Sequence, residues 1–304
     1  MTTRAASEKW GIGERRIRTL CINGRIEGAV KDGIFWLLPK STAKPTDKRF
    51  KVEDNLYFEL PKTFFAEGDK KLAKLNAKRP LPKNTLLSLR ENTVLEWTYN
   101  SNAIEGNTLT LRETKVVLEG LTVGGKSVTE HLEVINHKEA IEFLEELVKS
   151  DAPLTERDIK DIHALILKKI DGTNVGGYRI ENVIISGASH KPTEHFLLPE
   201  LMEKLVIRYG GWQSLHPIVR AAYIHGEFVK IHPFIDGNGR TARLLMNFEV
   251  MKAGYPPIVI KKEIRTEYYD TLDSAHTTGD YTEFIRLLTK QENESLDLYL
   301  SVIG

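Results

Sequence analysis

From residue 85 onward the sequence repeats one pattern, apolar residues at helical spacing separated by short polar breaks. This spacing gathers apolar side chains on one face of each helix and predicts a helical body. The segment 182–187, NVIISG, interrupts the series because it is short, β-branched and bounded by glycine; it predicts a small β-hairpin. Helices are expected at 85–100, 128–149, 155–169, 199–209, 217–231, 240–253, 265–276 and from 281 onward. Thr155 and Asp158 have the spacing of an N-terminal cap.

The composition excludes several classes of protein. With 304 residues, 41% hydrophobic and 28% charged, the chain is neither collagen-like nor disordered. Its one cysteine, Cys21, excludes an internal disulfide framework and cysteine-cluster metal sites. No apolar run approaches the roughly 18 residues that span a bilayer, and the first ten residues, MTTRAASEKW, are too polar for a signal peptide. We therefore expect no membrane partner and a cytoplasmic location.

The charge is distributed unevenly along the chain. Residues 1–50 hold 11 Lys and Arg against 5 Asp and Glu, a balance of +6, whereas the remaining 254 residues hold 32 against 37, a balance of −5. A basic module that precedes a mildly acidic body indicates two functions, the first of which is binding to a polyanion.

The first 40 residues predict a helix-turn-helix followed by a hairpin. Thr2 or Thr3 begins a helix that ends near Trp10, and a second helix is expected at 14–23 after a glycine break. Asp32-Gly33 then predicts a two-residue turn between short strands. Together these elements outline a winged helix-turn-helix, in which a basic helix contacts DNA. Its candidate DNA-binding residues are Arg15, Arg16 and Arg18.

The wording WGIGERRIR and GRIEGA in this module resembles the excisionase and MerR-like DNA-binding modules. A basic structural cap or a protein-docking module is the alternative interpretation. The polar stretch 41–49 has no periodicity and carries Pro45, so it predicts a linker. We divide the chain into a winged helix-turn-helix-like module at 1–40, a linker and connecting helix at 41–84, and a helical domain at 85–304.

One run of twelve residues, HPFIDGNGRTAR at 232–243, has the residue types of a catalytic site. It combines a helix end, a glycine-punctuated loop and the start of another helix. Gly237 and Gly239 let successive backbone amides converge, and with the positive end of the following helix they form an anion site. Arg240 and Arg243 provide further donors for phosphate oxygens.

The same run contains a base and a metal ligand. His232 is the group in this run that takes up a proton near neutral pH, and Asp236 is a single hard carboxylate of the kind that Mg²⁺ shares with substrate phosphates. These are the components of phosphorus-group transfer. A metal hydrolase built from His216, His225, His232 and Asp236 is disfavoured, because seven residues separate His225 from His232 by roughly 10 Å of helix. A plain helix-loop-helix with surface arginines is the other alternative.

The run fits the pattern HxFx(D/E)GNGRxxR at every fixed position and resembles the signature of the Fic (filamentation induced by cAMP) proteins. The resemblance covers about 85–290, and GYR at 177–179 with the segment 183–187 is similar to the family's target-docking flap. It implies a Fic-type helical fold with a small β-hairpin flap. It also implies transfer of AMP from ATP to a protein hydroxyl, with release of pyrophosphate.

The resemblance also implies a role for each site residue. His232 would be the general base, and Asp236 would be the Mg²⁺ ligand. The phosphates would be bound by the amides of Gly237, Asn238 and Gly239, with Arg240 at the β-phosphate and Arg243 at the γ-phosphate. Tyr269 would line the adenine pocket, and the flap that docks the target would contain Val183, Ile184 and Ile185. The chain departs from the pattern at His276, where an asparagine against the adenine is expected. Use of UTP or CTP therefore stays open.

A second pattern lies upstream, SNAIEG at 101–106, which fits (S/T)xxxE(G/N), the inhibitory motif of the Fic proteins. Ser101 and Glu105 are four residues apart, so both lie on one face of a helix. The resemblance implies that Glu105 pairs with Arg243 and denies it to the γ-phosphate. In the alternative interpretation this is an ordinary helix end at about 85–106, with Glu105 in solvent and Gly106 as its cap.

The sequence thus predicts an autoinhibited protein adenylyltransferase of mainly α fold. Its expected partners are ATP, Mg²⁺ and a target protein, and a second copy of the same chain can serve as that target. DNA is a further expected partner, bound at residues 1–50. Two alternatives stay open. One is a nucleotide-sensing transcriptional regulator, and the other is an enzyme that removes AMP from modified protein.

Overall fold

The computed structural model describes residues 1–10, 13–14, 17–18, 21, 26, 28–33, 35–39, 42, 60–150 and 152–303. The chain divides into two compact units, Met1–Asp54 and Asn55–Gly304. In the described ranges no helix is both long enough and apolar enough to cross a membrane.

The first unit contains one described helix, α1 (Thr3–Trp10), and a two-stranded antiparallel sheet. Strand β1 (Val30–Asp32) pairs with β2 (Phe35–Leu37) in the register Val30↔Leu37. The predicted first helix and hairpin are therefore confirmed. The small core of this unit consists of Ala6, Trp10, Ile17, Cys21, Ile26 and Leu38.

Two predictions for this unit need comment. Asp32 pairs with Phe35 and therefore belongs to β1, whereas the prediction placed it in an Asp32-Gly33 turn. Gly33 has φ +58° and lies in the connection itself, because glycine tolerates this left-handed backbone. The predicted helix at 14–23, with Arg15 and Arg16, falls largely outside the described residues. Arg18 is among the described residues, and its Nη2 lies 3.4 Å from Glu14 Oε1.

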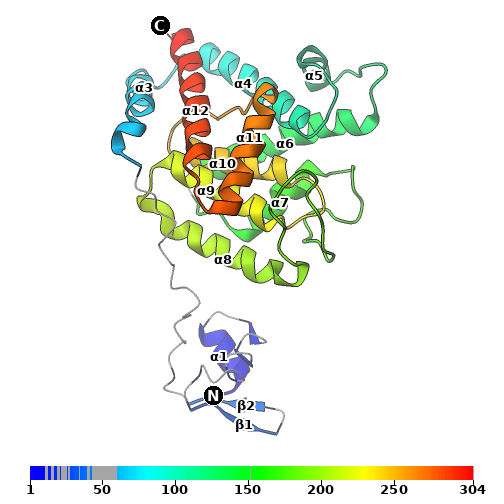
Figure 1. Ribbon diagram of the computed structural model, residues 1–304, viewed down its shortest axis with the longest axis vertical. Helices are drawn as coiled ribbons and strands as arrows, with labels where there is room; N and C mark the ends of the chain where they lie inside the picture. The colour runs from blue at the N-terminus through cyan, green and yellow to red at the C-terminus, as the bar shows by residue number, and fades with distance from the viewer. Residues whose placement is uncertain are drawn as a thin grey trace. The chain divides into compact units, whose positions relative to one another are not determined.

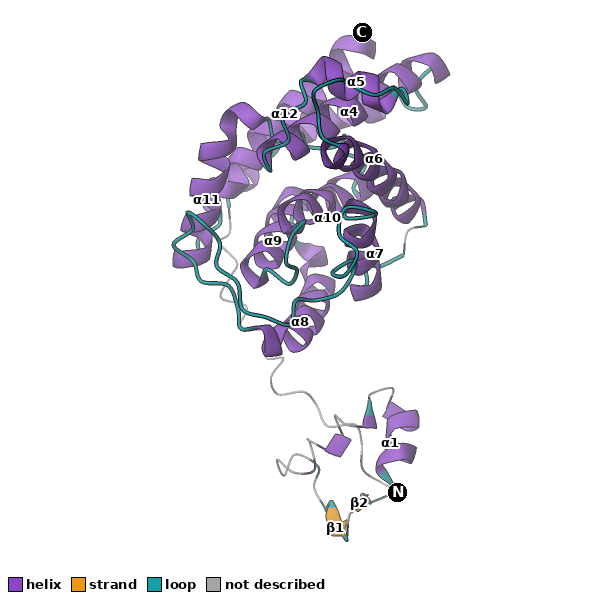
Figure 2. Ribbon diagram, turned by 90° about the vertical axis from the view of Figure 1, so that its right-hand side faces the viewer, coloured by secondary structure: helices purple, strands orange, loops and turns teal. Residues whose placement is uncertain are grey.

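In the second unit every described element of regular secondary structure is a helix. Its α-helices are α3 (Ala66–Asn76), α4 (Lys83–Ile104), α5 (Leu111–Leu118), α6 (Val128–Lys149), α7 (Glu156–Ile166), α8 (Leu198–Gly211), α9 (Pro217–Ile231), α10 (Asn238–Lys252), α11 (Arg265–Thr278) and α12 (Thr282–Ile303). Short 3₁₀ helices lie at Lys62–Phe64, His195–Leu197, Trp212–Ser214 and Lys262–Ile264. In two views at right angles, α9 and α10 lie at the centre with the other helices around them (Figures 1 and 2).

Helix α10 is buried on every side, and every residue from Arg240 to Val250 is buried. Several of its buried polar side chains have internal partners, although the Thr241 hydroxyl has no hydrogen-bond partner among the described residues. Asn247 exchanges hydrogen bonds of 2.9 and 2.7 Å with the backbone of Ile258, and Glu249 accepts from Arg220 at 2.5 Å. The helix that begins at the glycine-rich run is thus held rigidly in the core.

Local capping fixes where several helices begin. Capping boxes with reciprocal bonds occur at Thr155 and Asp158, Thr110 and Glu113, and Ser127 and Glu130. The predicted Thr155 cap is therefore confirmed. Helix α5 was not predicted, although a capping box of the same kind, formed by Thr110 and Glu113, marks its start.

The predicted hairpin at 182–187 is wrong. Among the described residues the sheet of β1 and β2 is the only one, and Figure 1 shows the segment after α7 as an irregular green loop. Amides that follow the segment bind side chains: Ser189 N and His190 N both donate to Asp273 Oδ1, at 2.8 and 3.1 Å, and His195 N donates to Asn182 Oδ1 at 2.9 Å. Side-chain contacts thus hold this loop, where the prediction expected a ladder between strands.

Candidate active site

The run 232–243 forms the turn between α9 and α10. Helix α9 ends at His232, which has the left-handed φ of +53°, rare for a residue with a side chain. The buried amide of Asn238 then braces the loop: Phe234 N donates to Asn238 Oδ1 at 3.0 Å, and Asn238 Nδ2 donates to Phe234 O at 2.9 Å. In this arrangement the Asn238 side chain is used to hold the loop in shape.

Two glycines permit this geometry for different reasons. Gly237 caps α10 with φ +76°, in the left-handed region that favours glycine. Gly239 is in the first turn of α10, where an added Cβ would lie 2.2 Å from Glu105 Oε1. The glycine at 239 therefore lets a carboxylate approach the start of the helix, which is the place where an anion is favoured.

His232 is a neutral base at pH 7 in this environment. Burial, followed by the charge of Arg179, lowers its pKa to about 4, against the opposing effects of the Val229 carbonyl, Glu105 and Asp236. Arg179 Nε donates to His232 O at 2.9 Å. The ring is thus ready to accept a proton across the physiological range.

Asp236 is the exposed carboxylate of the loop, with 64% of its side chain accessible. Oδ1 accepts from Gly237 N at 2.6 Å, and Oδ2 lies 3.2 Å from Arg240 Nη2. Among the described residues no three His, Cys, Asp or Glu side chains gather to hold a metal ion. One hard carboxylate suits Mg²⁺, which takes its remaining ligands from phosphates and water.

The second arginine of the run, Arg243, is 2% exposed and bound by the end of α4. Its Nη2 donates to Glu105 Oε1 at 2.7 Å and to Ser101 O at 2.8 Å, and its Nε donates to Ser101 Oγ at 3.0 Å. Burial, the largest single effect, lowers the pKa of Arg243, but Glu105 and Tyr268 together outweigh it, so the pKa is raised. The ion pair that the family resemblance implied between Glu105 and Arg243 is present.

The same segment is also a regular helix end. Gly106 has φ +104°, Gly106 N donates to Ala103 O, and Asn107 N donates to Asn102 O, each at 3.1 Å. These two bonds form a Schellman motif, with Glu105 at the C-cap. The helix end of the alternative interpretation is therefore confirmed, but its solvent-exposed Glu105 is wrong, because the carboxylate pairs with Arg243. The cap geometry aims Glu105 at Arg243, and an inhibitory role for this pair stays a prediction.

The first arginine, Arg240, has a carboxylate partner that the sequence did not reveal. It is 2% exposed, and its Nη1 donates to Glu133 Oε1 on α6 at 2.9 Å. Asn107 Nδ2 donates to the other oxygen of Glu133 at 2.7 Å. Glu133 thus links Arg240 to the segment that follows Glu105.

Of the two adjacent tyrosines, the sequence singled out the outer one. Tyr269 is 39% exposed, with its hydroxyl 3.5 Å from Ile104 O at the end of α4. Tyr268 is buried; its hydroxyl accepts from Arg243 Nη1 at 3.4 Å and lies 2.8 Å from His225 Nε2. Tyr268 therefore positions the arginine.

His276 is enclosed by α9 and by the loop after α7. Its Nε2 bonds Gly226 O at 2.9 Å, and its ring packs edge-on against His190 with centroids 5.3 Å apart. Burial lowers its pKa to about 4. The His276 ring is therefore buried, and its Nε2 is bonded to a backbone carbonyl of the protein.

His163 on α7 was missed by the sequence analysis. Its ring stacks on Phe234 at 3.6 Å between centroids, its Nδ1 accepts from Gly176 N at 3.1 Å, and its Nε2 therefore donates to Asp236 O at 3.0 Å. Burial lowers its pKa to about 4, which keeps this tautomer neutral. Nothing in the local pattern around His163 signals a role in the loop.

The structure also separates the histidines of the metal-hydrolase alternative. His225 is buried against Tyr268, and His216 pairs with Asp69 Oδ1 at 3.1 Å. Among the described residues, neither histidine joins His232 in a group that could bind one metal ion.

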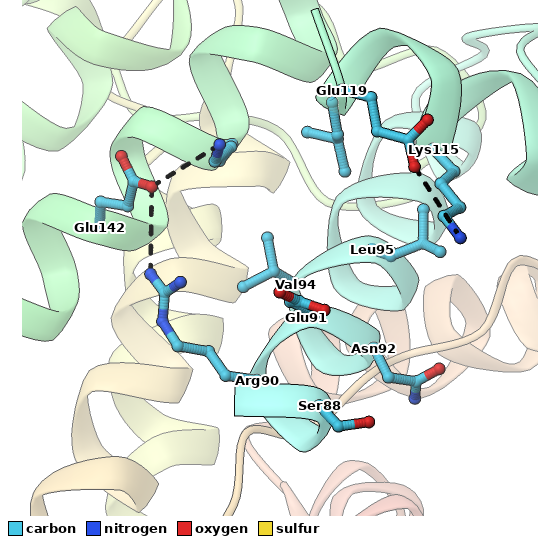
Figure 3. Close-up of a pocket in the computed structure, with 11 residues that line it drawn as sticks. Ser88, Arg90, Glu91, Asn92, Val94, Leu95, Lys115, Glu119 and Glu142 are labelled. Atoms are coloured by element: carbon cyan, nitrogen blue, oxygen red, sulfur yellow. Dashed lines mark ion pairs between the residues drawn. The ribbon is translucent and has the colours of Figure 1, made fainter. Parts of the chain in front are cut away.

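A pocket of about 570 Å³ lies between α4, α5 and α6, and its lining includes no residue of 232–243. Figure 3 shows ion pairs among its charged side chains, Glu142 with Arg90 and Glu119 with Lys115. Glu142 also pairs with Lys138. We therefore place the candidate site at the α9–α10 loop and not in this pocket.

Comparison with known proteins agrees with this placement. The model of the Fic/DOC family matches residues 153–250. The Protein adenylyltransferase Fic of Nematostella vectensis is 37% identical over 274 residues, 86% of this chain and 62% of the relative. That of Drosophila willistoni is 37% identical over 245 residues, 76% of this chain and 48% of the relative. The chain thus spans about half to three fifths of these curated relatives.

Two solved structures are similar over most of the chain. A Fic domain containing signaling protein from Bacteroides thetaiotaomicron has a TM-score of 0.72 and 32% identity, and covers 79% of this chain and 97% of its own. Fic-1 (residues 134–508) from C. elegans has a TM-score of 0.73 and 32% identity, over 79% and 71% of the two chains.

Proposed function

Because this chain belongs to the Fic/DOC family, we propose that it transfers AMP from ATP to a hydroxyl of a protein side chain. The observation that carries the proposal is the arrangement at the start of α10. A base, an exposed carboxylate, a glycine-permitted anion site and two buried arginines meet there within twelve residues. The proposal also draws on the curated relatives, which are protein adenylyltransferases.

The nucleotide would bind over the N-terminus of α10. The amides of Asn238 and Gly239 would face the phosphates, since they lie in the first turn of α10. The Gly237 amide, which donates to Asp236 Oδ1 in this structure, would have to leave that carboxylate to complete the cradle. Arg240 and Arg243 contact the β- and γ-phosphates, and Tyr269 lines the adenine pocket. Asp236 would hold Mg²⁺, which would supply positive charge that offsets the negative charge of the phosphates.

The chain's own residues then move the proton. His232, with its pKa near 4, takes the proton of the target hydroxyl as the oxygen forms its bond to the α-phosphorus. The bond from the α-phosphorus to the bridging oxygen breaks, and pyrophosphate leaves. Protein-bound AMP and pyrophosphate account for every atom.

Glu105 would inhibit this reaction in the resting chain. It occupies Arg243 and lies against Gly239, where the γ-phosphate needs both groups. A carboxylate tethered to the end of α4 competes at high effective concentration with a nucleotide from solution.

Labelled nucleotides test the proposed function directly. Incubation with ATP labelled at the α-phosphorus should label protein, whereas label at the γ-phosphorus should appear in pyrophosphate. Protein labelling from the γ-position would indicate a phosphotransferase instead. Loss of label from previously modified protein, without any gain, would favour the AMP-removing alternative.

The loop after α7 is proposed to dock the target. Ile184 is 89% exposed, and Val183 and Ile185 flank it half-buried. Replacing Ile184 with Asp should lower target labelling at least about threefold, roughly 0.65 kcal/mol of binding, because a charge interrupts an apolar contact surface. ATP affinity should not change.

Ile207→Asp provides the matched control, since Ile207 is a 46% exposed isoleucine on α8. Labelling rates of both variants are measured at saturating ATP. Equal rates for Ile184→Asp and the wild type would place target docking elsewhere.

Residues 1–50 are proposed to form a winged helix-turn-helix that binds DNA, on the basis of their +6 balance. Replacing Arg15, Arg16 and Arg18 together with Ala should weaken DNA binding by the full chain at least about tenfold at low salt. It should also flatten the salt dependence, because fewer counterions are released. Fluorescence anisotropy measures both effects.

The control replaces three exposed basic residues of the second unit, Lys149, Arg157 and Arg286. An equal loss for both triple variants would mean nonspecific attraction. No loss for either would favour the protein-docking alternative for this module.

A further inference from the structure

Arg179 is a buried arginine that binds three backbone carbonyls from separate segments. It is 3% exposed. Nε donates to His232 O at 2.9 Å, Nη1 donates to Glu181 O at 2.7 Å, and Nη2 donates to Thr193 O. Its own backbone N donates to Pro233 O at 3.0 Å. One side chain thus contacts the end of α9 and both ends of the exposed loop.

We call residues 180–194 the docking flap. Its two ends meet at Arg179 through Glu181 and Thr193, and His195 N closes the same neck by donating to Asn182 Oδ1. Its far part is held to α11 by Asp273, which accepts from two consecutive amides. A further bond joins His190 Nε2 to Lys230 O on α9 at 3.0 Å. Because the flap has no strand ladder of its own, contacts of this kind hold it where it lies.

The charge of Arg179 is not neutralised by a carboxylate. In the described part of the chain all its hydrogen-bond acceptors are backbone carbonyls, and it takes part in no ion pair there. Retaining a buried charge without a counterion is costly, so the three carbonyl hydrogen bonds are the contacts that hold the guanidinium in place.

We propose that Arg179 is a positioning residue that fixes the docking flap and the backbone of His232 in one arrangement, so that a hydroxyl held by the flap reaches the His232 ring. The part of this inference that concerns the reaction rests on the proposed function. The physical coupling of the flap to His232 does not.

The charge adds a second consequence for His232. The groups that act on its ring are Arg179 from the flap base, Glu105 from the end of α4, Asp236 from the loop and the Val229 carbonyl from α9. Of these Arg179 alone disfavours the imidazolium. Removing its charge should therefore raise the pKa of His232, and the acid limb of the pH–rate profile should move to higher pH.

Two variants separate geometry from charge. Arg179→Lys keeps the charge but loses the rigid fork that binds three carbonyls. Arg179→Met loses both. Arg157→Met is the matched control, since Arg157 is an exposed arginine on α7 paired with Asp161. All three are made in the otherwise wild-type chain and in the Glu105→Gly chain.

In the wild-type background we expect hydrogen exchange of residues 180–194 to accelerate at least about tenfold in both Arg179 variants. The His232 resonance, assigned from its absence in His232→Ala, should titrate as in the wild type for Arg179→Lys. It should titrate at higher pH for Arg179→Met. Neither readout needs catalysis. Arg157→Met should match the wild type in both.

In the Glu105→Gly background we expect self-labelling at saturating ATP to fall at least about tenfold in both Arg179 variants, because a displaced hydroxyl reacts slowly. The ATP concentration at half-maximal rate should stay within about twofold. The acid limb should move only for Arg179→Met.

Unchanged flap exchange in Arg179→Lys overturns the positioning role, and this variant decides the matter if Arg179→Met fails to unfold cooperatively. An unchanged His232 titration in Arg179→Met overturns the electrostatic part. Absence of any labelling in the Glu105→Gly parent counts against the proposed function instead, and the exchange and titration results still decide the coupling.

Discussion

Replacing His232 with Ala is expected to slow AMP transfer by about a hundredfold to ten-thousandfold, the usual contribution of general base catalysis. ATP affinity should change by less than about twofold, because the base acts on the target hydroxyl and not on the nucleotide. The pKa of about 4 means that this loss should be nearly constant from pH 6 to pH 8. Labelling rates and calorimetric titration with ATP and Mg²⁺ measure the two quantities.

Asp236→Ala is the informative comparison, because it should weaken ATP binding in the presence of Mg²⁺ and leave binding without Mg²⁺ little changed. His131→Ala controls for loss of a histidine away from the loop; His131 lies in the first turns of α6 and accepts from Val123 N. If His232→Ala transferred AMP at the wild-type rate, the proton route proposed here would be wrong.

Replacing Glu105 with Gly is expected to raise self-labelling at least about tenfold, roughly 1.4 kcal/mol of barrier. The change frees Arg243, whose Nη2 now binds Glu105 Oε1 at 2.7 Å, and vacates the space beside Gly239. The γ-phosphate gains an arginine partner, and the α-phosphate aligns for attack. Autoradiography at equal protein concentration measures the gain.

The chain offers a close control for this variant. Glu119 is the C-cap of α5 and is followed by Gly120, just as Glu105 caps α4 and is followed by Gly106. Glu119→Gly makes the same chemical change at a helix end away from Arg243, so it should leave labelling unchanged.

A double variant tests the reason for the gain. Glu105→Gly combined with Arg243→Ala should lose the increase, because the released arginine is what productive binding needs. Thermal unfolding of each variant identifies any that fails to fold. Equal labelling by Glu105→Gly and the wild type would reduce residues 101–106 to a helix end.

The sequence determined the features of this protein that depend on neighbours along the chain. The cap at Thr155 and Asp158 forms within four residues, and the turn at Gly237 needs only a residue that tolerates φ +76°. The shared face of Ser101 and Glu105 follows from helical spacing alone. The pairing of Glu105 with Arg243, 138 residues away, came from the family resemblance and not from the local pattern.

Tertiary structure alone decided how the loop is supported. Glu133 lies 107 residues from Arg240, and His163 lies 73 residues from Asp236. Helix α6 carries several other acidic residues, so its sequence gives no reason to choose Glu133. Only the packing of α6 against α10 distinguishes it.

The flap shows the physical reason most clearly. Its sequence favours a strand, yet two of its amides bind Asp273, its Asn182 side chain accepts from His195 N, and its carbonyls bind Arg179. Backbone carbonyls and amides occur at almost every position, so a side chain that binds them leaves no partner pattern in the sequence. The chemistry at His232 was readable from twelve consecutive residues, whereas the position of that chemistry relative to a target depends on contacts that form only when distant segments pack together.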